Sequence, residues 1–241
     1  MSKAIVVIPT YNEIENIESI IKAVFSLPTH FHVLIVDDNS PDGTSQKVEV
    51  LQNQFEGQLF LTVRAKKSGL GTAYVHGFKW ALSQGYDFVF EMDADFSHNP
   101  KDLERLLYAC ETDKADMAIG SRYSTGVNVV NWPLNRVLMS YFASIYVKLI
   151  TGMKIHDATA GFICYRKNVL ENIHLERIKF IGYAFQIEMK YRAYVQKFKI
   201  VEVPIIFTDR TKGQSKMSGS IIREAIFGVI LLRVRKIFNQ L

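Results

Sequence analysis

Short runs of β-branched and other apolar residues alternate with longer amphipathic segments through the first half of the chain. The apolar runs predict buried strands over 4–8, 32–36, 59–63, 88–90 and 117–119. Apolar residues at helical spacing predict helices over 13–25, 44–55, 72–83 and 102–109. Strands and helices in this order form βαβ units. We therefore expect an α/β fold with a mostly parallel central sheet and helices on both of its faces.

Polar clusters follow four of these strands, where open α/β sheets bind their ligands. The clusters are PTYNE (9–13), DDNSPDGT (37–44), DAD (93–95) and GSRY (120–123). Local roles explain part of this pattern, with Asn12 as a helix cap and with Asp42 and Gly43 in a turn before a helix that starts at Thr44 or Ser45. The adjacent acids Asp37 and Asp38 favour a ligand role, because like charges at a strand end cost stability unless a cation or a hydrogen-bond donor uses them.

Asp93 and Asp95 stand two residues apart after an apolar strand, so their side chains point to the same side of an extended backbone. Two carboxylates in that position suit Mg²⁺ or Mn²⁺, which let substrate phosphates complete their ligand shell. Taken alone, an Asp-x-Asp is more often a turn or a helix cap. The glycines at 69 and 71 do not indicate a nicotinamide cofactor, since Tyr74 stands where a third glycine belongs.

The pattern changes beyond residue 125. A polar loop over 128–135 precedes an apolar helix over 137–149, and a loop over 157–161 leads to a strand over 162–165. A helix over 183–195 and an extended segment over 200–207 follow. The polar loop 210–219 either folds over an anion or is a solvated linker.

The last residues, 220–241, are apolar on most sides of a helix yet carry four basic residues, Arg223, Arg233, Arg235 and Lys236. Such a helix either lies on an anionic membrane surface or packs on its own domain. The apolar helix over 137–149 is a partner for it in either case.

With 241 residues and an apolar fraction of 48%, the chain can bury one large α/β domain with a small extension. The formal charge of +5 favours anionic partners, which are phosphorylated ligands, acidic lipids or nucleic acid. Cys110 and Cys164 lack metal-ligand spacing and indicate a reducing compartment. No signal peptide is expected, and no apolar run reaches the ~20 residues of a membrane span.

Together the motifs resemble the polyprenol phosphate mannose synthases, or dolichol phosphate mannosyltransferases, of glycosyltransferase family two. Further shared motifs are GLGTAYVHGF (69–78), MDADFSHNP (92–100), and Arg210 with GQSKMS (213–218). The resemblance covers nearly the whole chain. It implies a GT-A type nucleotide-sugar domain, which we place over 1–218, before the amphipathic C-terminal helix expected over 219–241. It also implies metal-dependent, inverting transfer of mannose from GDP-mannose to a polyprenyl phosphate.

The resemblance assigns roles to matching residues. The guanosine would be held by Pro9, Tyr11, Glu13, Val36 and Asp38. Asp93, Ala94 and Asp95 would meet the diphosphate and a Mg²⁺ or Mn²⁺ ion, with Ser97 at a third metal position where water can replace its weak hydroxyl ligand. The catalytic set would be Asp95, Arg122, Arg210 and Lys216, of which the last two are expected to face solvent in the free enzyme.

The acceptor decides whether a base is needed. A phosphate monoester is already anionic at neutral pH, because its second pKa is about 6, whereas a sugar hydroxyl would need a base such as Glu188 or Asp157. With a lipid phosphate, Glu188 should instead position a loop or a basic residue. The alternatives are another donor such as UDP-glucose, a sugar-hydroxyl acceptor, or a non-catalytic nucleotide-sugar-binding subunit.

The resemblance also implies a cytoplasmic enzyme, peripheral on the cytoplasmic face of a membrane, with no nucleic-acid partner. Membrane contact would come from the C-terminal helix, from the helix over 137–149, or from a separate membrane subunit.

Overall fold

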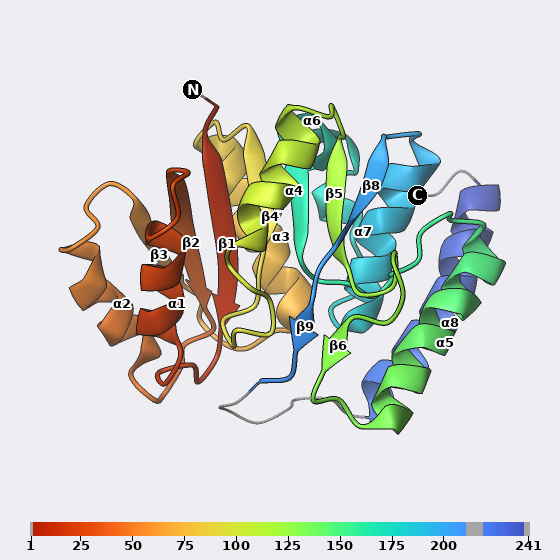
Figure 1. Cartoon of the computed structure of the whole chain (residues 1–241), viewed down its shortest axis with the longest axis horizontal. Coiled ribbons are helices and arrows are strands. Elements are labelled where there is room, and N and C mark those ends of the chain that lie inside the picture. Colours follow the sequence, from red (N-terminus) through yellow and green to blue (C-terminus); the bar gives the residue numbers. More distant parts are fainter. Residues whose placement is uncertain (1, 211–218, 239–241) are drawn as a thin grey trace.

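A seven-stranded sheet forms the centre of the protein, of which the computed structural model describes residues 2–210 and 219–238. The strand order is β3-β2-β1-β4-β7-β5-β8 (Figure 1). The strands are β1 (Ala4–Thr10), β2 (Phe31–Asp37), β3 (Leu59–Val63), β4 (Phe88–Glu91), β5 (Met117–Ser121), β7 (Ile163–Arg166) and β8 (Ile200–Pro204). Only β7 runs antiparallel to its neighbours in this sheet, which confirms the predicted mostly parallel arrangement.

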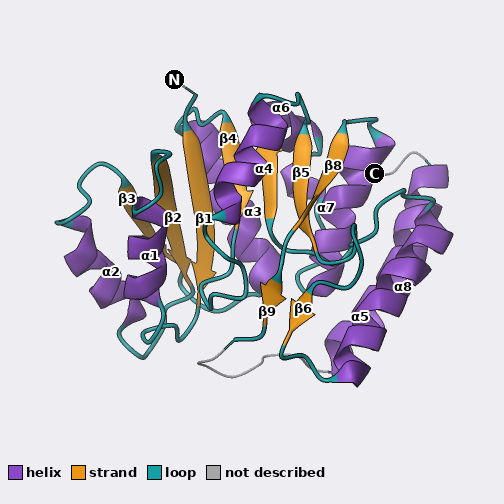
Figure 2. Cartoon of the chain, viewed as in Figure 1, coloured by secondary structure: helices purple, strands orange, loops and turns teal. Residues whose placement is uncertain are grey.

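Helices cover both faces of the sheet (Figure 2). One face packs against α1 (Ile17–Phe25), α2 (Thr44–Gln52) and α4 (Asp102–Glu111). The other packs against α3 (Leu70–Ser83), α6 (Lys167–Asn172) and α7 (Tyr183–Val195). In β1, Val7 enters the core on the α3 side and Ile8 enters the core on the α1 side. Because alternate side chains of a strand point to opposite faces, a strand buried on both faces is a continuous apolar run.

Two longer helices, α5 (Leu134–Thr151) and α8 (Gly219–Ile237), lie side by side at one end of the sheet (Figure 1). Val147 of α5 and Val229 and Leu232 of α8 are buried in the core on the α7 side. The C-terminal helix thus packs on its own domain through one face and leaves an apolar face exposed. Within residues 2–210 and 219–238, no helix is long and apolar enough to cross a membrane.

Several elements differ from the sequence-based expectation. Helix α1 begins at Ile17, and Asn12 is not its cap, because Asn12 has a positive φ of 56° and its backbone N–H donates to Ser40 Oγ. A small parallel sheet of β6 (Val129–Val130) and β9 (Phe207–Thr208) was not predicted, nor were α6 and the 3₁₀ turn Leu175–Arg177. Most of the predicted polar loop 210–219, including Lys216, lies outside the described residues.

The order of the strands in the sheet determines where a ligand site is expected. The chain winds outward from β1 to β3 in one direction and from β1 to β4 in the other, so the switch point of the topology lies between β1 and β4. Ligands of open α/β sheets bind at the carboxyl ends of the strands beside such a point. The residues that follow β1, β2 and β4 therefore meet at one edge.

Candidate active site

Asp93 and Asp95 lie in the loop that follows β4. Asp93 Oδ1 accepts a hydrogen bond from the Tyr74 hydroxyl of α3 at 3.3 Å. Asp95 Oδ1 accepts from the Ser97 backbone N–H at 3.0 Å, and Asp95 Oδ2 lies 3.1 Å from an Arg210 guanidinium nitrogen. Burial, followed by the charge of Asp95, raises the pKa of Asp93 to about 7. Two acids held together at a shielded edge form an arrangement that a cation stabilises.

The donor set fits a hard divalent cation. Among the described residues, no three His, Cys, Asp or Glu side chains gather closely enough to form a protein-only metal shell. Two carboxylates are what Mg²⁺ or Mn²⁺ uses when water and phosphate oxygens supply the remaining ligands. Ser97 is buried in the turn beside Asp95, and its role as a third ligand stays a prediction.

His98 is a residue of this edge that the sequence reasoning missed, although it lies within MDADFSHNP. Its imidazole is buried, stacks on Phe162 at 4.8 Å and contacts the edge of Phe207 at 5.3 Å. Burial lowers the pKa of His98 to about 4, so the ring is neutral at pH 7. Its Nδ1 accepts a long hydrogen bond from the Asp93 N–H at 3.5 Å, which helps to fix the carboxylate loop.

The acids after β2 have partners inside the protein. Asp37 is fully buried and accepts from the Thr10 hydroxyl at 2.8 Å and from the backbone and hydroxyl of Ser40 at 2.8 and 2.6 Å. Asp38 pairs with Arg64 at 2.6 Å. These contacts supply the hydrogen-bond donors and the cation that the adjacent charges of Asp37 and Asp38 need. The adjacency of the two acids is therefore no argument for an external ligand.

The residues expected to hold a nucleoside do meet at the edge. Pro9 and Val36 are register partners in β1 and β2, and Tyr11 and Glu13 follow β1 directly. The side chains of Val36 and Ala94 are buried in the two cores, so only their main chains remain for a ligand. Lys67 Nζ lies 4.2 Å from the centre of the Tyr11 ring, which adds a cation beside this position.

Arg122 is tightly held by Asp157. Its backbone N, Nε and Nη2 donate to the Asp157 carboxylate at 2.9, 2.7 and 2.6 Å, and Nη2 also donates to Thr159 at 2.8 Å. Burial alone would raise the pKa of Asp157, but the charge and hydrogen bonds of Arg122 hold it below its ordinary value. The pairing ties the loop after β5 to the loop before β7.

Glu188 of α7 is fully buried. Its carboxylate accepts from the backbone N–H groups of Lys179 and Phe180 at 2.9 and 3.1 Å and from Arg192 at 2.8 and 3.0 Å. Glu188 therefore positions a loop and a basic residue, as the lipid-phosphate interpretation predicts.

The expectation that Arg210 faces solvent is wrong. Its side chain is only 26% exposed, because it folds back onto Asp95. The next residue toward the N-terminus, Asp209, pairs with Arg136 of α5 at 2.8 Å.

A second polar group lies at the start of α5 and was not predicted. The Arg136 guanidinium lies 4.1 Å from the Trp132 ring centre, and that of Arg122 lies 5.4 Å from it. Trp132 Nε1 and Ser124 Oγ are buried and have no hydrogen-bond partner within the described part of the chain. The unpartnered Trp132 N–H thus lies beside two guanidinium groups, which pair with Asp157 and Asp209, and this surrounding suits an anion.

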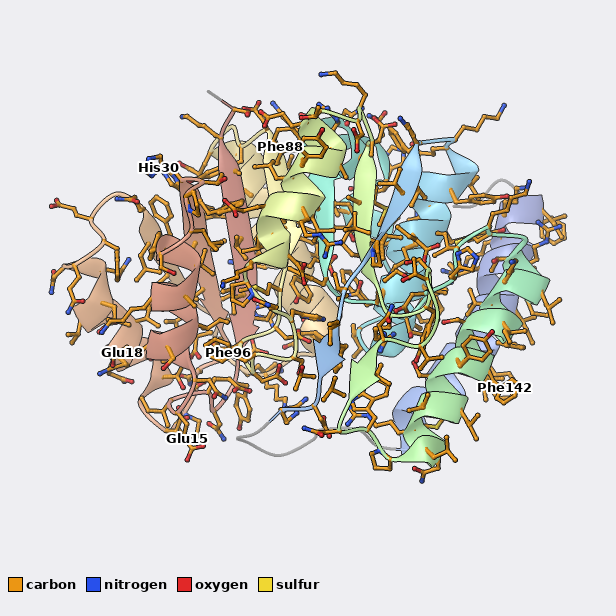
Figure 3. The ribbon with its side chains drawn as sticks, in the orientation of Figure 1. Glu15, Glu18, His30, Phe88, Phe96 and Phe142 are labelled. Atoms are coloured by element: carbon orange, nitrogen blue, oxygen red, sulfur yellow. The ribbon has the colours of Figure 1, made fainter. Side chains whose placement is uncertain are left out.

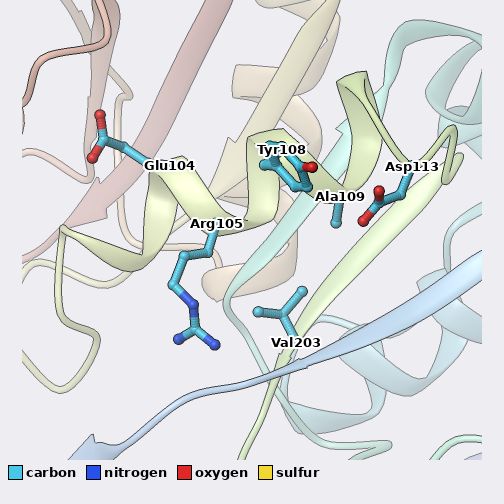
Figure 4. Close-up of a pocket in the computed structure, with 6 residues that line it drawn as sticks. All are labelled: Glu104, Arg105, Tyr108, Ala109, Asp113 and Val203. Atoms are coloured by element: carbon cyan, nitrogen blue, oxygen red, sulfur yellow. The ribbon is translucent and has the colours of Figure 1, made fainter.

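A pocket of about 420 Å³ lies apart from this edge, beside α4 and β8 (Figure 4). Its lining residues are Glu104, Arg105, Tyr108, Ala109, Asp113 and Val203. None of the predicted site residues lines it, so it is not the candidate site.

The chain is similar to known proteins in its sequence and in its fold. The family model described as Glycosyl transferase family 2 matches residues 5–174. The chain is 48% identical to a polyprenol monophosphomannose synthase of Mycolicibacterium smegmatis, over 94% of this chain and 85% of that protein. It is 42% identical to an undecaprenyl-phosphate mannosyltransferase of Micrococcus luteus, over 94% of this chain and 92% of that protein.

Two solved structures share the fold. A glucosyl-3-phosphoglycerate synthase of Mycobacterium tuberculosis, in complex with Mn²⁺, UDP and phosphoglyceric acid, matches with a TM-score of 0.73 and 15% identity, over 96% of this chain and 78% of that one. A mannosyltransferase of Pyrobaculum calidifontis, in complex with GDP-mannose and Mn²⁺, matches with a TM-score of 0.62 and 14% identity, over 98% and 64%. The predicted GT-A type fold is confirmed.

Proposed function

The chain belongs to glycosyltransferase family 2, and from that premise we propose that it moves mannose from GDP-mannose to a polyprenyl phosphate, with inversion at the sugar carbon. The observation that carries the proposal is the pair of carboxylates, Asp93 and Asp95, gathered with Arg210 at the switch point of the sheet. The two mannosyl-transferring relatives support the acceptor and the sugar.

The edge of the sheet around Asp93 and Asp95 suits the diphosphate that leaves the sugar. Glycosyl transfer builds negative charge on the departing phosphates, so preorganised positive charge lowers the barrier. When bound to Asp93 and Asp95, Mg²⁺ or Mn²⁺ would supply part of that charge as a Lewis acid. Arg210 would supply more from the segment after β9, and we assign Lys216 the same role from the sequence motif. The nucleoside would rest against Tyr11, Glu13, Asp38 and the main chain of Pro9 and Val36.

The residues around Arg122 and the start of α5, where the acceptor substrate would bind, suit a phosphate better than a sugar hydroxyl. Both carboxylates that could serve as a base are engaged, Asp157 by Arg122 and Glu188 by Arg192 and a loop. A phosphate acceptor needs no base, because it is already anionic. The donor Trp132 Nε1, together with Arg122 and Arg136, would hold it at the start of α5.

The exposed face of α5 and α8 suits the lipid part of the acceptor. It includes Phe142 and Leu149, which are 59% and 77% exposed, and Phe142 points away from the body of the protein (Figure 3). The exposed apolar side chains of α5, of α8 and of the residue that follows α8 are Leu134, Leu138, Met139, Tyr141, Phe142, Ile145, Leu149, Ile226, Phe227, Ile230, Leu231, Val234, Ile237 and Phe238. Helix α5 has no acidic residue, and Arg235 and Lys236 lie in the last turn of α8. We propose that this face lies on an anionic membrane, at the cytoplasmic side.

Vesicle flotation tests the membrane contact. The double variant Phe142→Ser/Leu149→Ser should bind vesicles containing phosphatidylglycerol several-fold more weakly than the wild type, because it loses apolar area that enters the lipid. Tyr108→Ser is the matched control, since Tyr108 on α4 is 58% exposed and outside this face. Equal binding by the wild type and the double variant would remove the proposed surface and leave a separate membrane subunit as the means of attachment.

A transfer assay tests the reaction. The protein is mixed with labelled GDP-mannose, polyprenyl phosphate and Mn²⁺, and the proposal predicts labelled mannosyl lipid. Replacing the donor by UDP-glucose should abolish most of the product. A donor-binding protein that yields no labelled lipid would be a non-catalytic subunit, and faster transfer from UDP-glucose would overturn the choice of donor.

A further inference from the structure

Glu202 is a largely shielded carboxylate of β8 that the proposed reaction does not use. Its side chain is 11% exposed, and both of its oxygens accept hydrogen bonds. Oε1 accepts from the Ser121 hydroxyl at 2.7 Å and from the Asp157 N–H at 2.9 Å. Oε2 accepts from the His156 N–H at 2.9 Å and lies 2.7 Å from His156 Nδ1. Hydrogen bonds to an ionised acceptor are the stronger kind, so these contacts tie several segments to one side chain.

The segments tied to Glu202 lie on both sides of Arg122. Ser121 directly precedes Arg122, and its hydroxyl oxygen accepts from the Tyr123 N–H at 3.3 Å. Asp157 holds the Arg122 guanidinium through its carboxylate, at 2.7 and 2.6 Å. Glu202 Oε1 therefore joins the end of β5, which leads into Arg122, to the loop that carries the counter-ion of Arg122. A shift of either segment would move the guanidinium.

The same loop is held at its other end by Lys190 of α7. Lys190 is fully buried, and its Nζ donates to Ala160 O at 2.5 Å and to Gln186 O at 3.1 Å. The loop over 156–160 is thus fixed at its start from β8 and at its end from α7. Groups held in this way by their own fold are already oriented when a substrate arrives.

We propose that Glu202 is a positioning residue, which sets the place of Arg122 for the acceptor and touches neither substrate. The inference rests on the proposed function, in which Arg122 helps to hold the phosphate of the lipid. Loss of Glu202 should weaken the acceptor and leave binding of the donor at Asp93 and Asp95 unchanged, because those acids follow β4 and are not its partners. A merely structural role would reduce the folded fraction, which lowers kcat and leaves the KM for the lipid unchanged.

Steady-state transfer from GDP-mannose, with the concentration of polyprenyl phosphate varied, tests this. Glu202→Ala should raise the KM for polyprenyl phosphate about tenfold. The Kd of GDP with Mn²⁺, measured by calorimetry, should stay within about twofold of the wild type. Glu202→Gln keeps an oxygen for Ser121 and Asp157, so its KM for the lipid should lie within about threefold of the wild type. Ser121→Ala removes one donor to the same oxygen and should raise this KM by a smaller factor, which keeps the test open if Glu202→Ala does not fold.

Glu104→Ala is the matched control, because Glu104 of α4 also fixes another segment, through the N–H and hydroxyl of Thr29 at 3.3 and 3.0 Å. Its KM for the lipid should stay within about twofold of the wild type. An unchanged lipid KM in Glu202→Ala and Ser121→Ala, or an equal rise in the lipid KM and in the Kd of GDP, would overturn the inference and leave the proposed function standing. No labelled lipid from the wild type would instead overturn the proposed function, and the inference with it.

Discussion

Replacing Asp157 by Asn separates a structural acid from a catalytic base. Asp157 accepts three hydrogen bonds from Arg122, at 2.6, 2.7 and 2.9 Å, and both side chains are buried. Asn keeps the shape of Asp157, but its amide NH₂ would face an N–H donor of Arg122. The Arg122 guanidinium would also lose the negative charge of the Asp157 carboxylate. Breaking a buried pair in this way costs about 3–5 kcal/mol. For a domain of this size that lowers the melting temperature by about 6–20 °C.

The assay is thermal unfolding followed by circular dichroism, with turnover measured well below the melting temperature of the variant. We expect a large loss of stability. At the low temperature of the turnover assay, we also expect a loss of turnover, because Arg122 is displaced in the variant. A variant that melts within about 2 °C of the wild type yet loses turnover several hundredfold would refute the reasoning. Asp157 would then be the base of a reaction with a sugar hydroxyl.

Three further predictions follow from the structure. Glu188→Gln should lower turnover far less than Asp95→Asn, because Glu188 holds a loop and Arg192; equal losses of several hundredfold would favour a hydroxyl acceptor. Burial raises the pKa of Glu91 from 4.5 to about 7, so the free energy of unfolding of the wild type should fall as the pH rises through that window. In urea unfolding, Glu91→Gln should remove this part of the pH dependence. An unchanged pH dependence would contradict the raised pKa of Glu91. Gly77→Ala should lower the free energy of unfolding by about 1–3 kcal/mol, because its Cβ would collide with Val7 Cγ1 of β1; a denaturation midpoint equal to that of the wild type would show that α3 can move away.

Much of the sheet could be predicted because its central strands are buried on both faces. The runs over 4–8 and 88–90 are apolar at every position, and they correspond to the buried strands β1 and β4. Helix α7 was predicted with its observed bounds, since Gly182 precedes its first residue and the polar residues Gln196 and Lys197 follow its last. Short elements such as β6 and β9 could not be found, because a two-residue strand is defined by its partner and has no period of its own.

The site was predicted in its residue types and less well in its contacts. The Asp93 and Asp95 pair follows from the period of two in an extended chain. The pairing of Arg122 with Asp157, and of Arg210 with Asp95, joins residues that are distant in sequence, and only the tertiary structure brings them together. For the same reason the argument from Asp37 and Asp38 failed, because Thr10, Ser40 and Arg64 supply partners from inside the fold.

Anomalous diffraction from crystals grown with Mn²⁺ and GDP is the most direct test of the central claim, that Asp93 and Asp95 hold a cation against the diphosphate of the donor. The account predicts one manganese peak within bonding distance of Asp95, with phosphate oxygens of GDP on its far side. Bound GDP with no anomalous peak at these carboxylates would contradict it.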